Sequence, residues 1–548
     1  MFGRGAPGAA ARPTPFLVGP IVGAATETTG RVLIEVDKTT VVTMEAFMDG
    51  SKVCSLSQAR QLRAKTPTVF KLRGFSPAKR IRVVVGVGEF GQEREARFTT
   101  TSNKAQWKIA AVSCNCHTHI EKLGLWDRLS RVAGDLDCVV HLGDQIYGDE
   151  DFAAKSGSSM RFESAWQACL TILEPIPQNE WGSHRAELLE CYRKTYRKTW
   201  NMPMVAKVLA SAVNYMICDD HEFTDDLGDE PEHSNPDTVD FFVATIAYQV
   251  FCEYQKQLLT DLDVADATVK PYYAVKLSPK VGLFMTDNRV ERSLHRRTQG
   301  PESLWKDRDF LGPDQWNRLT EAFSEDFADC DTVLFGAPTP LVFISQTATG
   351  IAQKKIDDAR GTWGHKSFIS EQKACAKLLS EWQLARSNRA LVTLAGDVHI
   401  GGFTDSWHNE AAIPLHQMTA SAVGNTPERD IDSLQEMVMR SVMHADEHLF
   451  KFKVKHYEWI YGPNYGMVDI ELSNKGRPNI TLTLVPQVGV PKMRNLELGN
   501  SKVDVKNTEL TLASKSAKAT AAIMGVPPEG PAIEATNAPG CKCSCSVS

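Results

Sequence analysis

Five short segments of the sequence place metal-binding or acid–base residue types directly after an apolar run. They are residues 112–117, 141–147, 218–222, 286–289 and 395–399. Carboxylates prefer hard cations, whereas thiolate, phenolate and imidazole groups prefer transition metals. Because the segments supply all four kinds of ligand, they indicate a centre that holds more than one metal, of different hardness.

The elements that must position these segments alternate between strands and helices after residue 105. Such alternation is typical of an α/β core, in which ligands gather beyond the carboxyl ends of the strands. The five segments are therefore expected to converge in space. Apolar runs predict strands at 108–113, 136–142, 213–218, 281–286, 332–336, 390–395, 466–472 and 479–485, and amphipathic stretches predict helices at 125–133, 186–199, 239–259, 313–323 and 370–387.

Each segment also has a simpler interpretation. An Asp after a strand, such as Asp144, often caps the next helix. A lone cysteine such as Cys114 is more often a buried apolar residue, and the Asp220-His221 pair is compatible with a plain turn. The joint occurrence of all five segments in this order favours a metal centre over these separate interpretations.

Several of the segments match a known set of motifs. Residues 143–147 read G-D-Q-I-Y, residues 219–222 read D-D-H-E, residues 396–399 read G-D-V-H, and Ser-Cys stands at 113–114. This combination resembles the alkaline phosphatase D (PhoD-like) family of the calcineurin-like metallophosphoesterase superfamily. The resemblance covers about residues 16–485.

The domain organisation follows from composition together with this resemblance. Short β-branched runs at 31–36, 80–85 and 94–100 predict a small antiparallel β-sandwich near the N-terminus. The resemblance implies an α/β fold with a four-layer α/β/β/α metallophosphoesterase core after that sandwich. We therefore expect a disordered N-terminus at 1–15, a sandwich at 16–103, a catalytic domain at 104–488 and a flexible tail at 489–548.

The resemblance also implies metal cofactors, namely iron accompanied by calcium. Carried over position by position, it makes Cys114, Asp144 and Tyr147 ligands of a ferric site, with Asp144 as the bridge to a second metal. It leaves open how Asp397 and His399 divide between the two metals. The implied metal ligands are Cys114, Asp144, Tyr147, Asp220, Asp397 and His399.

The expected activity is hydrolysis of phosphate monoesters or diesters by a metal-bound hydroxide. Two cations neutralise the anionic ester and lower the pKa of a bound water. His221, beside Asp220, is the candidate general acid, oriented by Glu222 or another nearby carboxylate. Asn288 and Arg289 are candidate substrate-binding residues, and the alternative for Arg289 is a structural salt bridge.

Two other functions compete with this hypothesis. One is hydrolysis of phospholipid headgroups at a membrane surface, and the other is a scaffold protein with a degenerate metal centre. The complete set of Cys, Asp, Tyr and His positions argues against the scaffold. The natural substrate does not follow from the sequence, because loops such as 150–185 and 345–370 would determine specificity.

Composition limits the class of protein. The chain has 548 residues, which predicts more than one domain, and its 42% hydrophobic and 23% charged residues exclude a disordered, collagen-like or membrane-spanning chain. With 61 basic and 67 acidic residues the net charge is −6, which argues against nucleic acid as a partner. Ten of the 13 cysteines are scattered, as in a cytoplasmic protein, and Cys138 and Cys218 lie in apolar runs that predict burial.

The C-terminal residues form a candidate lipidation motif. Cys545 stands four residues from the end, as in a C-a-a-X prenylation signal, and Cys541 and Cys543 are placed for palmitoylation. One lipid chain anchors a protein only marginally, so a second attachment is physically reasonable. A fortuitous cysteine or a Cys-x-Cys-x-Cys metal or redox cluster is the alternative. Anchoring to the cytoplasmic face of a membrane is thus a hypothesis.

Overall fold

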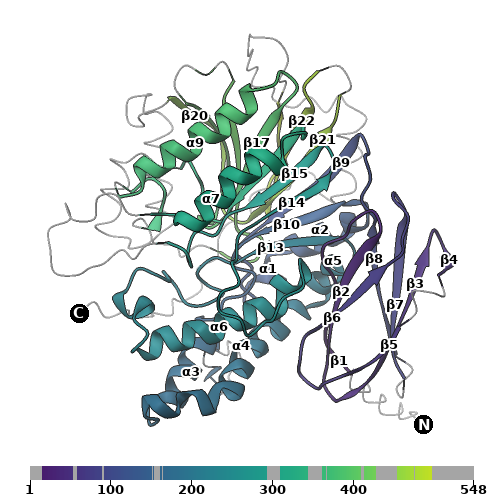
Figure 1. Ribbon diagram of the computed structural model, residues 1–548, viewed down its shortest axis with the longest axis vertical. Coiled ribbons are helices and arrows are strands. Elements are labelled where there is room, and N and C mark those ends of the chain that lie inside the picture. The colour runs from purple at the N-terminus through teal and green to yellow at the C-terminus, as the bar shows by residue number, and fades with distance from the viewer. Residues whose placement is uncertain are drawn as a thin grey trace, which may run out of the picture.

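The computed structural model describes residues 15–53, 58–88, 92–150, 152–153, 161–162, 164–292, 309–343, 361–365, 367–408, 411, 413–426, 453–473 and 476–496. Within these ranges the chain forms a mixed α/β fold with several sheets (Figure 1). Residues 1–14 of the predicted N-terminal segment lie outside the described residues, as do Cys541, Cys543 and Cys545. Among the described helices, none has both the length and the apolar character needed to cross a bilayer.

Two antiparallel sheets form the N-terminal part of the chain. In β8 (Gln92–Thr99), Ala96 and Phe98 are buried while Arg97 between them is exposed, which is the period of two expected for a half-buried strand. One sheet has the order β1-β2-β6, from β1 (Phe16–Val22), β2 (Thr29–Val36) and β6 (Thr68–Arg73). The other has the order β4-β3-β7-β8, with β5 paired to β3, from β3 (Thr40–Met48), β4 (Ser51–Lys52), β5 (Gln58–Leu62), β7 (Arg80–Val87) and β8.

The first three of the five segments with candidate metal ligands follow strands of a six-stranded sheet. Its order is β13-β10-β9-β21-β22-β23, in which β13, β10 and β9 are parallel and the others antiparallel. The last strand extends the sheet beyond the expected domain boundary at 488, because its backbone pairs with β22 although its sequence is not apolar. The strands are β9 (Gln106–Val112), β10 (Cys138–Leu142), β13 (Val213–Ile217), β21 (Asn464–Glu471), β22 (Asn479–Pro486) and β23 (Lys492–Leu496).

A seven-stranded sheet carries the other two segments. Its order is β14-β15-β16-β17-β19-β18-β20, and β15, β16, β17 and β19 run parallel. The apolar pattern does not predict β18 to β20, since β18 contains two glycines and polar residues interrupt β19. The strands are β14 (Tyr273–Ser278), β15 (Val281–Met285), β16 (Thr332–Ala337), β17 (Ala390–Ala395), β18 (Ile400–Trp407), β19 (Leu415–Ala420) and β20 (Lys453–Tyr461).

Successive residues of the central strands face different hydrophobic cores. Ile109 of β9 and Leu334 of β16 belong to a cluster formed between the two large sheets, which also includes residues of the N-terminal sheets. Ala110 packs with helices α2 to α6, and Phe335 packs with α7 and α9. The helices are α1 (Ile120–Leu123), α2 (Leu125–Val132), α3 (Ala165–Leu173), α4 (Arg185–Trp200), α5 (Pro203–Leu209), α6 (Val239–Tyr254), α7 (Pro313–Glu321) and α9 (Ile369–Leu384).

A buried charge network joins the N-terminal sheets to the helices. Glu35 of β2 has no exposed surface. The guanidinium of Arg197 in α4 and the hydroxyl of Tyr254 in α6 each donate a hydrogen bond of 2.6 Å to its carboxylate. Because an unpaired buried carboxylate would be strongly unfavourable, these contacts hold the N-terminal sheets in one arrangement relative to helices α4 and α6.

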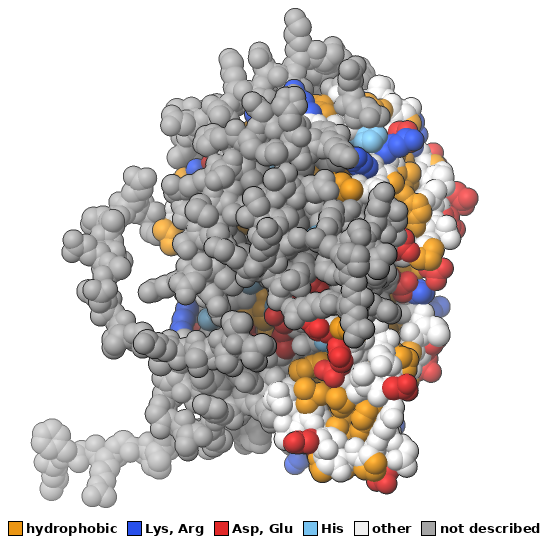
Figure 2. Space-filling model, turned by 90° about the vertical axis from the view of Figure 1, so that its left-hand side faces the viewer, with side chains coloured by type: hydrophobic (Ala, Val, Ile, Leu, Met, Phe, Trp, Pro, Cys, Tyr) orange, Lys and Arg blue, Asp and Glu red, His pale blue; other side chains and the backbone are white. Residues whose placement is uncertain are grey.

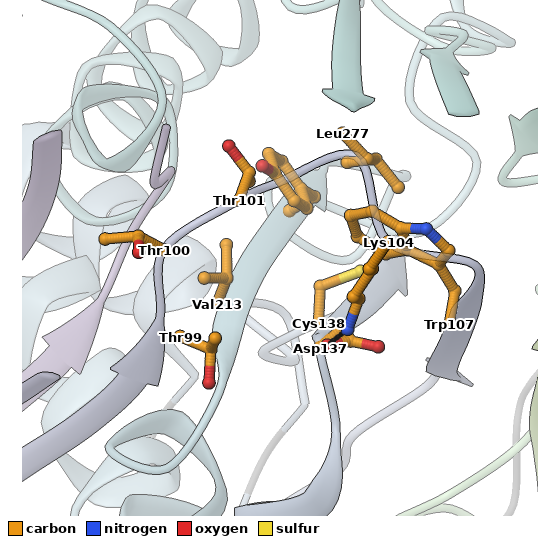
Figure 3. A pocket seen from close by; sticks show the side chains of 10 residues that line it. Thr99, Thr100, Thr101, Lys104, Trp107, Asp137, Cys138, Val213 and Leu277 are labelled. Carbon is orange, nitrogen blue, oxygen red and sulfur yellow. Dashed lines mark hydrogen bonds and ion pairs between the residues drawn. The ribbon is translucent and has the colours of Figure 1, made fainter. Parts of the chain in front are cut away.

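The connection between the two parts lines a small pocket at the amino ends of the strands. The walls of the pocket come from residues 99–101, the starts of β9, β10 and β13, and Leu277 (Figure 3). Lys104 forms an ion pair with Asp137 here, and its ammonium lies 4.6 Å from the centre of the Trp107 ring. The pocket lies at the opposite end of the strands from the chemical segments, and Cys138 beside it is buried as predicted.

Candidate active site

The carboxyl ends of β9, β10, β13, β15 and β17 meet at one edge of the two large sheets. Two glycines permit the close approach. A Cβ atom on Gly143, after β10, would lie 2.5 Å from the Cβ of Asp219, and one on Gly396, after β17, would lie 2.6 Å from the Cβ of Ser113. Distances under 3.0 Å are not possible for carbon atoms in contact. Glycine is therefore required where these strand ends touch.

Four of the predicted ligands have left-handed backbone conformations. The φ angles are 55° for Cys114, 55° for Asp144, 68° for Asp397 and 54° for His399. This region is unfavourable by about 1–2 kcal/mol for residues with a Cβ, so the surrounding contacts must hold the chain there. Residues with strained backbone conformations cluster at functional sites, so these four positions mark a candidate site.

The first part of the site is the thiol–phenol cluster, formed by Cys114, Tyr147 and His399. The Cys114 thiol donates to Asp144 Oδ2 at 3.4 Å and lies 3.1 Å from the hydroxyl of Ser421. The Tyr147 hydroxyl lies 3.2 Å from His399 Nε2. Segments that are far apart in the sequence are thus brought together around Asp144.

Burial keeps the groups of this cluster in their neutral forms. It raises the pKa of the Cys114 thiol well above its ordinary value, and the charge on Asp144 raises it further. Burial likewise raises the pKa of Tyr147 and lowers that of His399 to about 4. A bound cation would reverse the effect on the thiol and the phenol, because it stabilises their anions.

Asn425 supports the same cluster. Its side-chain amide donates to the Tyr147 hydroxyl at 3.0 Å and lies 3.4 Å from His399 Nε2. Its carbonyl oxygen lies 3.0 Å from Nδ1 of His119. Asn425 and Ser421 both follow β19, so their place in the site was missed together with that strand. No sequence motif identified either residue.

The second part of the site is the carboxylate–arginine cluster, formed by Asp219, Asp220, Asp397 and Arg289. The Arg289 Nε atom donates to Asp219 at 2.6 Å. Its Nη2 atom lies 3.3 Å from a carboxylate oxygen of Asp220 and 3.5 Å from one of Asp397. The Arg289 side chain is 4% exposed. Arg289 therefore forms the structural salt bridges that the sequence offered as the alternative to substrate binding.

The carboxylates of this cluster differ in their protonation. Burial raises the pKa of Asp219 to about 7, although Arg289 opposes the shift. Burial also acts to raise the pKa of Asp220, but the charge of Arg289 and other favourable contacts lower it overall. One carboxylate oxygen of Asp219 is buried without a hydrogen-bond partner. The single guanidinium therefore leaves negative charge in the cluster that further cations could compensate.

His221 lies between the two clusters. Its backbone N–H donates to Asp144 Oδ1 at 3.3 Å and to Asp220 Oδ1 at 3.1 Å. Nδ1 of the ring lies 2.9 Å from both carboxylate oxygens of Asp149. Burial alone would lower the pKa of His221, but the charges of Asp149, Asp220 and Asp144 raise it well above its ordinary value.

The Glu222 carboxylate binds backbone N–H groups and not the His221 ring, so the alternative of another nearby carboxylate as the orienting group stays a prediction. Its carboxylate accepts hydrogen bonds from the backbone N–H groups of Asp144 (2.9 Å), Gln145 (2.7 Å) and Asp219 (2.8 Å). Glu222 thereby ties the end of β10 to the end of β13. Its burial raises its pKa to about 7.

Asn288 is placed away from any open surface. It has no exposed area, its side-chain oxygen accepts from the backbone N–H of Thr339 at 3.1 Å, and its amide donates to Thr286 at 3.4 Å. Because both of its polar atoms are used within the strand ends, its environment argues against the predicted contact with substrate.

The residues present fit a metal centre. Ligand atoms of Asp144, Asp220 and His221 all lie within 4.8 Å of one another. The thiol–phenol cluster supplies sulfur, oxygen and nitrogen donors, and the carboxylate–arginine cluster supplies hard oxygen donors, one of them an unpartnered Asp219 oxygen. Figure 2 shows Asp and Glu side chains near the middle of the face that it views, with hydrophobic side chains below them.

Comparison with known proteins identifies the fold and the family. A family model described as PhoD-like phosphatase matches residues 109–478. A solved structure described as "Structure of PhoD" superposes with a TM-score of 0.63 at 14% identity, covering 91% of this chain and 95% of that one. A second, "GAP50 the anchor in the inner membrane complex of Plasmodium", gives 0.35 at 11% identity, covering 78% of this chain and 98% of that one. No curated protein sequence matches the chain.

The fold and the family model define the class of protein as a phosphoesterase, a hydrolase of phosphate esters. The chain belongs to the PhoD-like phosphatase family, as its sequence motifs suggested, and it is a phosphatase enzyme. Membership of the family implies metal ions and a phosphate-ester substrate.

Proposed function

We propose that this protein hydrolyses phosphate monoesters, phosphate diesters or both, at a centre of two metals of different hardness. The observation that carries the proposal is the meeting of the thiol–phenol and carboxylate–arginine clusters at Asp144. The Asp144 carboxylate lies 3.4 Å from the Cys114 sulfur through Oδ2, while Oδ1 accepts from the backbone N–H of His221. The position of the Asp144 carboxylate between the two clusters suits a ligand that both metals would share.

Each cluster would hold one kind of cation. We assign iron to Cys114, Tyr147 and His399, whose sulfur, phenol and imidazole donors suit a transition metal. We assign calcium to Asp220 and Asp397, which share the Arg289 guanidinium. Together such cations would neutralise charge on the phosphoryl group and lower the pKa of a water molecule.

The protein's own groups then bind the ester and move the proton. Arg289 remains tied to Asp219 through Nε, so its Nη atoms become available for a phosphate oxygen once cations compensate Asp220 and Asp397. His221 donates a proton to the leaving oxygen, which would otherwise depart as a poor alkoxide. Although burial alone would lower the pKa of His221, the charge of Asp149 beside the ring raises it, which favours the protonated imidazole.

The proposed architecture follows that of the family. We interpret the two N-terminal sheets as a β-sandwich at 16–103. The two large sheets with helices on their outer faces would form the four-layer α/β/β/α catalytic domain, which begins at 104 and includes β23.

Metal analysis combined with turnover tests this proposal. The purified full-length protein is expected to contain iron and calcium and to release 4-nitrophenol from 4-nitrophenyl phosphate or bis(4-nitrophenyl) phosphate. Phospholipids are assayed in parallel, and release of a headgroup alone would favour the membrane-surface alternative. Protein without bound metal and without turnover on any of these substrates would favour a scaffold and contradict the proposal.

A further inference from the structure

We propose that Cys191 and Cys169 form a reactive dithiol site, at which a hydroperoxide oxidises the pair to a disulfide between helices α4 and α3. The pair belongs to neither cluster of the candidate active site, so the inference does not depend on the proposed function. Nothing in the spacing of these cysteines along the chain indicates that they meet, and only the packing of the two helices brings them together.

The two thiols meet where α3 packs on α4. The Cys169 thiol donates a hydrogen bond to the sulfur of Cys191. The Cys169 sulfur also lies 3.7 Å from the backbone oxygen of Leu188, and the Cys191 sulfur lies 3.5 Å from the backbone oxygen of Glu187. Because these two oxygens belong to consecutive residues of α4, both sulfurs occupy the same part of its surface.

The two cysteines differ in their access to solvent. Of the nine cysteines that the structure describes, eight are buried and Cys191 alone is partly exposed. Cys169 has no exposed surface and lies in the hydrophobic core that α3 and α4 share. A dissolved oxidant therefore reaches Cys191 first, and the Cys169 thiol lies directly behind it.

The contact between the sulfurs also favours the thiolate of Cys191, which is the reactive form of a cysteine. The hydrogen bond from Cys169 lowers the pKa of Cys191, and although burial opposes this shift, the charge of Lys194 supports it. The pKa of Cys169 is raised, because its thiol donates that hydrogen bond and because it is buried. Cys191 is thus the nucleophile, while Cys169 keeps its proton until the second step.

Hydrogen peroxide accepts the electrons of the pair in two steps. The Cys191 thiolate attacks one peroxide oxygen and the O–O bond breaks, so that Cys191 becomes a sulfenic acid and the leaving hydroxide takes up a proton to form water. The Cys169 sulfur then attacks the Cys191 sulfur, the S–O bond breaks, and a second water leaves with the proton of Cys169. Two thiols are oxidised to one disulfide, and one peroxide is reduced to two water molecules.

Peptide mapping of the full-length protein tests this proposal. Reduced protein is exposed to hydrogen peroxide, its remaining thiols are blocked with iodoacetamide in denaturant, and it is digested with trypsin without reduction. Cleavage after arginine places the two cysteines on separate peptides, 162–185 and 186–193. We expect these peptides to be joined, at a mass two hydrogen atoms below their sum. Recovery of both peptides with blocked thiols, or of Cys191 joined to another cysteine, would overturn the proposal.

Two variants separate the roles of the two thiols. In Cys169→Ala the sulfenic acid on Cys191 has no thiol to react with, so dimedone should label Cys191 in at least about 10-fold higher yield than in the unchanged protein. In Cys191→Ser the buried Cys169 should stay reduced. Cys375→Ala removes a buried cysteine of α9 and is the matched control, in which the joined peptides should form as before. Equal dimedone labelling with and without Cys169, or oxidation of Cys169 in Cys191→Ser, would contradict the proposal.

Discussion

In the thiol–phenol cluster burial keeps the ionisable groups neutral, whereas in the carboxylate–arginine cluster a guanidinium lies among carboxylates, of which Asp220 has a lowered pKa and Asp219 a pKa of about 7. The Cys114 thiol and the Tyr147 phenol have raised pKa values because water does not reach them. Arg289, by contrast, contacts carboxylates of Asp219, Asp220 and Asp397. A few ångströms therefore separate two very different electrostatic environments.

The difference suggests how one edge of the sheets can select two cations. Neutral thiol and phenol groups must lose protons to bind a metal, which favours a strongly polarising transition metal. Carboxylates that are already ionised need no such loss and suit a hard cation. Asp144 lies between the two clusters, so a substitution of Asp144 should affect the metals of both clusters. A substitution within one cluster should affect the metal of that cluster alone.

The largest effect is expected from Asp144→Asn. Loss of the shared carboxylate should remove both metals and lower turnover by roughly 10³-fold or more, which corresponds to several kcal/mol of transition-state stabilisation. Metal content by mass spectrometry and turnover of 4-nitrophenyl phosphate measure this. Near-normal turnover would refute the assignment of Asp144.

Arg289→Met should destabilise the metal-free protein through the carboxylate–arginine cluster. Without the guanidinium the buried carboxylates are uncompensated, and the free energy of unfolding should fall by about 3–5 kcal/mol. Added calcium should restore part of the loss. The control is Arg131→Met, which breaks the exposed pair with Asp127, where both side chains are about half exposed. It should change stability by less than about 0.5 kcal/mol.

Cys114→Ser should affect the thiol–phenol cluster alone. Replacing the sulfur donor should lower the iron content while calcium stays bound, and turnover should fall by roughly 10²-fold. The ratio of iron to calcium in the purified variant is the measurement. If both metals disappear together, the division of the site into two clusters is wrong.

The stability of the metal-free protein should also depend on pH, and the two clusters should respond with opposite sign. His399 has a pKa of about 4 in the folded protein against an ordinary 6.5, so the stability it contributes is lost as pH falls from 6.5 towards 4. Asp219 has a pKa of about 7 against 3.8, so its contribution is present at low pH and lost as pH rises towards 7. Each group contributes up to about 1.4 kcal/mol per pH unit.

Chemical denaturation of metal-free protein at several pH values tests these signs. His399→Gln should reduce the loss of stability at acid pH, and Asp219→Asn should reduce the loss at neutral pH. Variants that shift the profile in the same direction would show that the two clusters do not differ as described.

Residue types and spacing were sufficient to predict which strand ends bring the candidate metal ligands together. The motifs at 113–114, 143–147, 219–222 and 396–399 identified the family, and the apolar runs identified β9, β10, β13, β15, β16 and β17. All of these strands except β9 are buried along their whole length, so their apolar signal survives in the sequence. The strands β18 to β20 were missed because Gly and polar residues interrupt their pattern, and Ser421 and Asn425 were missed with them.

The partners of each side chain were decided only by tertiary structure. The sequence by itself determined that Cys114, Asp144, Tyr147, Asp220, Asp397 and His399 would lie at strand ends and that a phosphatase would result. It could not determine that Arg289 would pair with Asp219, that Glu222 would bind backbone N–H groups, or that Asp149 would face His221. Such contacts join residues from different strands, and their geometry depends on how closely the sheets approach at Gly143 and Gly396. Local propensity carries no information on that distance, because it is set by packing across both sheets.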